Sequence, residues 1–112
     1  MRKLSIPLAV AGVLATLAVA ASGATQHKQK FVKVRDDLYA PAKVTIKVGD
    51  RVKWGWGDGT DHQHTVTEQH GKWTSKEKTI GSFKHTFGKT GTFKIYCADH
   101  PLDMRMKVIV TG

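Results

Sequence analysis

The sequence is poor in cysteine, since Cys97 is the only one among 112 residues, so the chain can form no internal disulfide. It also has no internal repeat, and beyond residue 30 no stretch in which apolar residues recur at the spacing of a helix face. These absences exclude a disulfide scaffold, a repeat array and a helix bundle. In a chain with an export signal, an unpaired cysteine is expected to be either a reactive thiol or a metal ligand.

The longest apolar stretch lies at the N-terminus, from Leu4 to about Ala20, and two basic residues precede it. Ser22-Gly23-Ala24 then supplies the small residues that a signal peptidase reads. A retained membrane anchor is the alternative, but Pro7 and Gly12 make the stretch a poor one. We therefore predict a cleaved signal and a periplasmic or secreted protein with no stable membrane insertion.

The domain organisation follows from this cut. We predict a signal peptide over residues 1–24, a flexible polar lead-in over residues 25–30 and one domain over residues 31–112. Such a domain is small, so it can bury only a limited core. Metal ligation would hold distant strands together and add to its stability.

Apolar and polar residues alternate in six segments of the mature chain, which is typical of half-buried strands. The segments are residues 31–35, 43–48, 51–56, 84–87, 92–97 and 104–110. Glycine, proline and aspartate mark turns between them. Six or seven short strands in this length predict an all-β fold, an antiparallel Greek-key β-sandwich.

Three metal-binding side chains lie within eight residues, in Cys97-Ala98-Asp99-His100-Pro101-Leu102-Asp103-Met104. Thiolate and thioether are soft donors that favour copper, and imidazole binds both of its common oxidation states. In the strand before them Cys97 shares a face with Phe93 and Ile95, so its thiol is expected to point inward. The alternative is that Cys97 and Met104 are ordinary core residues and that His100 has no role. It requires that all three donors, and the strand before them, fall into this arrangement by chance.

A second imidazole is available far upstream, in His64-Thr65-Val66. With it, the order of segments resembles the plastocyanin/azurin family of small blue copper proteins, the cupredoxins. The matching pieces are Val48 to Trp54, His64-Thr65-Val66, Gly81-Ser82-Phe83 with Phe87, Gly91 to Cys97, and Met104 to Val110.

The resemblance implies that one type 1 copper ion is bound by His64, Cys97 and His100, with Met104 as a weak axial ligand. Met106 has the same strand parity as Met104 and remains an alternative axial ligand. His62 lies two residues before His64, a spacing that multicopper oxidases use repeatedly, but it occurs once here. We therefore expect His62 to be a solvated loop residue, and His70 and His85 to be surface or strand residues.

The resemblance further implies a function in electron transport: a monomer that carries single electrons between larger redox proteins and is not an enzyme. The alternative is a periplasmic copper-binding protein for sequestration or delivery. A nitrite-reductase-like enzyme is not expected, because the domain offers no second metal site for catalysis and the chain is too short.

The net charge is +9, and Arg2 and Lys3 of the predicted signal contribute only two of these charges. Lysines are spread through the second half of the chain. We expect redox partners with acidic docking surfaces, which such a charge would steer. Nucleic acid is not expected, because no nucleic-acid-binding module is recognisable.

Cleavage after Ala24 would leave Thr25-Gln26-His27 at the new N-terminus. A free amine, two amides and a third-position imidazole supply four nitrogens, a set that suits square-planar Cu(II). The sequence thus predicts a second, non-thiolate Cu(II) site that depends on the exact cut.

Overall fold

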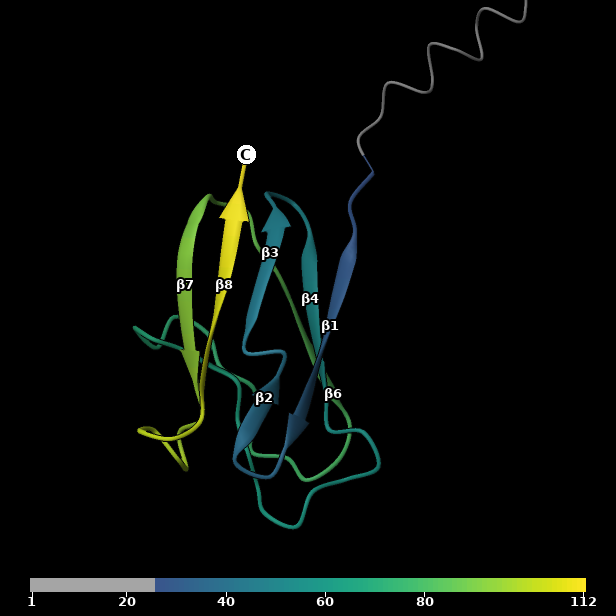
Figure 1. The fold of residues 1–112 in the computed structure, drawn as a ribbon, viewed down its shortest axis with the longest axis vertical. Helices are drawn as coiled ribbons and strands as arrows, with labels where there is room; N and C mark the ends of the chain where they lie inside the picture. Colours follow the sequence, from purple (N-terminus) through teal and green to yellow (C-terminus); the bar gives the residue numbers. More distant parts are fainter. Residues whose placement is uncertain (1–25) are drawn as a thin grey trace, which may run out of the picture.

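The structure, a computed structural model, describes residues 26–112, so the predicted signal peptide lies outside the described residues. Eight strands form two four-stranded sheets (Figure 1). The first sheet has the order β2-β1-β4-β6, with bounds Leu38–Ala40, Gln29–Arg35, Arg51–Gly55 and Ser82–Thr86. The second has the order β3-β8-β7-β5, with bounds Lys43–Lys47, Arg105–Thr111, Gly91–Tyr96 and Thr67–Glu68. The prediction of an all-β sandwich is confirmed.

The core forms where the apolar faces of the two sheets meet, because alternate residues of each strand point to the same side. In β1 the inward side chains are Val32 and Val34, and in β4 they are Val52 and Trp54. The second sheet contributes an equivalent set, and these residues form one buried cluster. In β7, Ile95 is buried while Lys94 is exposed, as the alternation predicts.

Two pairings differ from the predicted antiparallel arrangement: β1 pairs with β4 in parallel, and so does β3 with β8. The other four pairings are antiparallel. Side chains alternate in the same way in both kinds of pair, so the sequence pattern does not specify strand direction. The sequence also missed β2 and β5, which have three and two residues and are too short to show a pattern.

The sandwich has two distinct ends (Figure 1). At the lower end in that view, β7 stops at Tyr96 and β8 starts at Arg105, so residues 97–104 form the loop between them. At the upper end lie the end of β3 and the C-terminus. The predicted donors of the 97–104 loop therefore lie at the lower end. In the described part of the chain, no helix is long and apolar enough to cross a membrane.

Candidate metal centre

His64 is held in place by its own backbone. It forms an isolated bridge with Lys78, in which the amide of each residue donates to the carbonyl of the other, at 3.0 and 3.1 Å. The side chain is completely buried. Two backbone hydrogen bonds and complete burial leave this imidazole little freedom to move.

The loop from Cys97 to Met104 is closed by four backbone hydrogen bonds, one of which runs from the amide of Asp103 to the carbonyl of His100 at 3.3 Å. The amide of Cys97 donates to the carbonyl of Met104 at 3.0 Å, and the amide of His100 donates to the carbonyl of Cys97 at 3.1 Å. The amide of Met104 in turn donates to the carbonyl of His100 at 3.0 Å. Cys97 and Met104 are fully buried. These bonds fold the backbone of the three predicted donors into one compact loop.

The upstream segment and this loop meet at the sulfur of Cys97. Nδ1 of His64 lies 3.8 Å from Cys97 Sγ. The amide of Thr65 donates to the same sulfur at 3.3 Å, and the amide of Ala98 donates to the hydroxyl of Thr65 at 2.8 Å. Two segments more than thirty positions apart in sequence therefore contact each other at the thiol of Cys97. Donors from both segments could bind one metal ion only if the segments meet in this way.

His100 lies beside His64, with ring centroids 5.1 Å apart. Its Nε2 atom is buried, has no hydrogen-bond partner among residues 26–112 and lies 3.4 Å from Asp37 Oδ1. A buried nitrogen without a partner costs free energy unless a ligand satisfies it, so this atom fits a metal site. The donor set of two imidazoles, a thiolate and a thioether also fits copper.

Sequence reasoning missed two aspartates that follow β1. Asp37 offers a carboxylate oxygen within 4.8 Å of potential ligand atoms of His64 and His100. Its φ angle of 65° places it in the left-handed region, which aspartate tolerates in turns. Adjacent acidic residues at a strand end were the only signal in the sequence. A hard oxygen donor suits copper less well than the nitrogen and sulfur donors do.

Asp36 is the second missed residue. Its Oδ1 lies 2.9 Å from Nε2 of His64, and it accepts hydrogen bonds from the amides of Asp61 and His62 at 3.1 and 3.2 Å. The hydrogen bond with His64 is the main cause that lowers the pKa of Asp36 to about 2. Asp36 therefore links the end of β1 to the loop that precedes His64.

The two candidate axial methionines have different surroundings. Met106 lies on β8 opposite Ile95, and its Sδ accepts a hydrogen bond from the indole nitrogen of Trp54 at 3.2 Å. Met104 lies in the loop that also bears Cys97 and His100. Because Trp54 engages the sulfur of Met106, the geometry favours Met104, and the axial assignment stays a prediction.

The other histidines lie where the sequence predicted, on the surface or in a strand. The side chains of His62 and His70 are 65% and 71% exposed. His85 lies in β6 and stacks on Trp73 at 4.1 Å between centroids. The predicted N-terminal Cu(II) site includes Thr25, which lies outside the described residues, so that site also stays a prediction.

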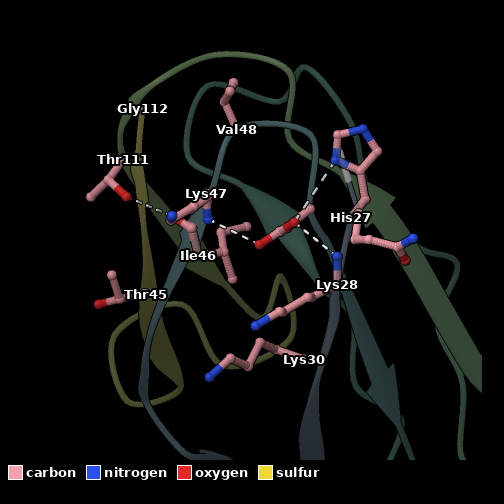
Figure 2. Close-up of a pocket in the computed structure, with 11 residues that line it drawn as sticks. His27, Lys28, Lys30, Thr45, Ile46, Lys47, Val48, Thr111 and Gly112 are labelled. Carbon is pink, nitrogen blue, oxygen red and sulfur yellow. Dashed lines mark hydrogen bonds and ion pairs between the residues drawn. The ribbon is translucent and has the colours of Figure 1, made fainter. Parts of the chain in front are cut away.

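A cavity of about 560 Å³ lies at the opposite end of the sandwich (Figure 2). Its walls include the side chains of Lys28, Lys30 and Thr45. Oδ1 of Asp50, another lining residue, lies 4.0 Å from Nδ1 of His27. No cysteine or methionine is among its lining residues. The buried Cys97 and His64 thus lie at one end of the sandwich, whereas the cavity at the other end is lined by none of the soft sulfur donors that copper prefers.

Solved structures share this fold. A pseudoazurin from Methylobacterium extorquens AM1 matches with a TM-score of 0.60 and 23% identity over 75% of this chain and 76% of its own. A purple cupredoxin from Nitrosopumilus maritimus matches at 0.59 and 24%, over 73% and 99% of the two chains. An amicyanin from Paracoccus versutus matches at 0.57 and 24%, over 80% and 87%.

No family model matches the sequence, and no curated protein matches it significantly. The relationship therefore rests on three-dimensional structure. The chain has the cupredoxin fold, as the sequence predicted.

Proposed function

We propose that this protein binds one type 1 copper ion through His64, Cys97, His100 and Met104, and that it carries single electrons between redox proteins. One observation carries the proposal: a buried thiol lies 3.8 Å from the Nδ1 atom of a buried imidazole, within a closed loop that supplies the remaining donors. Copper, when bound, supplies the Cu(I)/Cu(II) couple.

The chain's own residues prepare this site for electron transfer. The amide of Thr65 donates to Cys97 Sγ, and such hydrogen bonds tune the potential of a thiolate-bound metal. Burial keeps solvent and oxidants away from the sulfur. Because the backbone bonds already hold the donors close together, little rearrangement would accompany a change of oxidation state.

The route to a partner is proposed to pass through the edge of His100. Its side chain is 31% exposed, and the adjacent Leu102 is 83% exposed. With Pro101, which is also exposed, Leu102 offers a small apolar rim at the end of the sandwich that bears residues 97–104, which we name the metal end. The net positive charge of the whole chain would attract an acidic partner at long range. The predicted N-terminal signal supports a periplasmic or secreted location.

Copper sequestration or delivery is the second candidate, and it needs binding without redox cycling. A spectrum of the Cu(II)-loaded protein and its cyclic voltammogram separate the two functions. We expect an intense sulfur-to-copper charge-transfer band and a reversible one-electron wave. A colourless Cu(II) complex would exclude the type 1 site, and a coloured protein without a reversible wave would favour the carrier.

The acidic partner is tested by salt. The Debye length is about 10 Å at 0.1 M ionic strength, so steering between exposed charges weakens as salt is added. Electron transfer to an acidic redox protein should slow steeply as salt rises, and transfer to a neutral one should change little. If the two partners respond alike, the lysines serve only as a solubilising surface.

A further inference from the structure

We propose that Asp36 is a positioning residue for the metal centre: it fixes the tautomer and ring orientation of His64, and its charge favours Cu(II) over Cu(I). This inference rests on the proposed copper site and names a residue that the cupredoxin resemblance did not supply. The juxtaposition that carries it is the 2.9 Å contact between Asp36 Oδ1 and His64 Nε2.

The hydrogen bond determines which nitrogen of His64 is free. Both carboxylate oxygens of Asp36 already accept backbone N–H groups, Oδ2 from Asp61 and Oδ1 from His62. The carboxylate is thus placed as an acceptor, so Nε2 of His64 is the nitrogen that carries hydrogen and donates. Nδ1, which lies 3.8 Å from the sulfur of Cys97, then keeps its lone pair for a metal.

Asp36 cannot easily turn away from His64. It follows the last residue of β1, and Asp37 after it adopts a left-handed conformation that turns the chain. Its contacts with Asp61 and His62 fasten its two oxygens to the loop that leads to His64. Because these backbone contacts hold the carboxylate in place, its hydrogen bond fixes the orientation of the His64 imidazole.

The same contact has an electrostatic consequence. A carboxylate bonded to the far nitrogen of a ligating imidazole raises the basicity of that ligand. The side chain of Asp36 is 35% exposed, so solvent screens its charge only in part. Cu(II) carries one more positive charge than Cu(I), so it gains more from this environment. We therefore expect Asp36 to lower the reduction potential.

Two variants separate orientation from charge. Asp36→Asn keeps an oxygen that can accept the His64 hydrogen bond but removes the charge, and Asp36→Ala removes both. Asp61→Asn is the matched control, because it removes an exposed carboxylate in the same loop and leaves its backbone amide in place. Affinities for Cu(II) and Cu(I) are measured separately by competition with chelators.

For Asp36→Ala we expect Cu(II) affinity to fall about 10- to 100-fold, which is typical for loss of such a partner. Cu(I) affinity should fall less, and each tenfold change in their ratio raises the potential by about 59 mV. Asp36→Asn should raise the potential with a smaller loss of affinity, and Asp61→Asn should change neither. Equal losses for both oxidation states in Asp36→Ala and Asp36→Asn would overturn the charge role.

The tautomer is read from the metal-free protein by ¹⁵N NMR of the histidine side chains. We expect His64 to carry hydrogen on Nε2 in the wild type and in Asp36→Asn, and to lose this preference in Asp36→Ala. An unchanged tautomer in a folded Asp36→Ala protein would overturn the positioning role. This measurement needs no copper, so it decides on Asp36 even if the wild type forms no blue copper site.

Discussion

The two ends of the sandwich each contain an aspartate that fastens two backbone segments. At the metal end, Asp36 accepts the amides of Asp61 and His62. At the opposite end, which holds the cavity and which we name the cavity end, Asp50 accepts hydrogen bonds from the amides of Lys28 and Lys47 at 2.9 and 3.1 Å. These hydrogen bonds lower the pKa of both carboxyls, although in Asp36 the bond with His64 has the largest effect.

What differs is the histidine beside each aspartate. Nε2 of His64 is 2.9 Å from Asp36 and the ring is fully buried, whereas Nδ1 of His27 is 4.0 Å from Asp50 and the side chain is 58% exposed. A carboxylate that only fastens backbone stabilises the fold. One that also bonds a buried histidine next to a thiol is placed to act on the proposed copper site.

The difference between the two ends is tested most directly by removing the sulfur of Cys97 at the metal end. Cys97→Ser should abolish the charge-transfer colour of the Cu(II) protein completely, since the band requires the thiolate. His27→Ala, at the other end, should leave the colour unchanged. Absorption spectra of the two copper-loaded variants provide the measurement, and a coloured Cys97→Ser protein would contradict the ligand assignment.

The purely structural role assigned to the cavity end is tested with Asp50. Asp50→Ala leaves the amides of Lys28 and Lys47 without their acceptor, so the melting temperature of the metal-free protein should fall by several degrees. The copper spectrum and the potential should not change. A shift in potential equal to that of Asp36→Ala would show that the two ends are not independent.

Within the metal end, the two methionines should separate function from stability. Met104→Leu should raise the reduction potential, because it removes a weak donor to Cu(II). Met106→Leu should leave the potential nearly unchanged but destabilise the fold by about 1–3 kcal/mol, because the buried indole N–H of Trp54 loses its acceptor. Voltammetry and urea denaturation measure these effects. The axial assignment is wrong if only Met106→Leu moves the potential.

The smallest expected effect concerns His85, whose ring packs against Trp73 and Phe87 and not against a proposed ligand in the described part of the chain. Burial against Trp73 lowers its pKa below the ordinary value of about 6.5. The folded state therefore binds this proton less readily than the unfolded state, so stability is present above the ordinary pKa and is lost as pH falls below it. The melting temperature should drop between pH 7 and pH 5.

His85→Phe is the matched variant for this pH effect, since it keeps a ring that can stack on Trp73 and removes the titrating group. It should lose less stability over the same range, in melting curves recorded on the metal-free protein. Identical pH dependence in the variant and the wild type would assign the loss to other groups.

Much of the architecture could be predicted because strand alternation is a local property. The alternation over residues 92–97 predicted that Phe93, Ile95 and Cys97 point inward, and the last two are buried in the structure. Turn residues located most strand ends to within one or two residues. The donor chemistry of the 97–104 loop was likewise visible, because these residues are neighbours in the chain.

The sequence by itself determined that the chain forms alternating strands, and which side chains are available as soft metal donors. Only the tertiary structure decided that Asp36 meets His64 and that Trp54 meets Met106, pairs that lie 28 and 52 residues apart. It also decided that β1 runs parallel to β4. Such contacts depend on strand order and register across two sheets, and a period of two in the sequence is compatible with many of these arrangements.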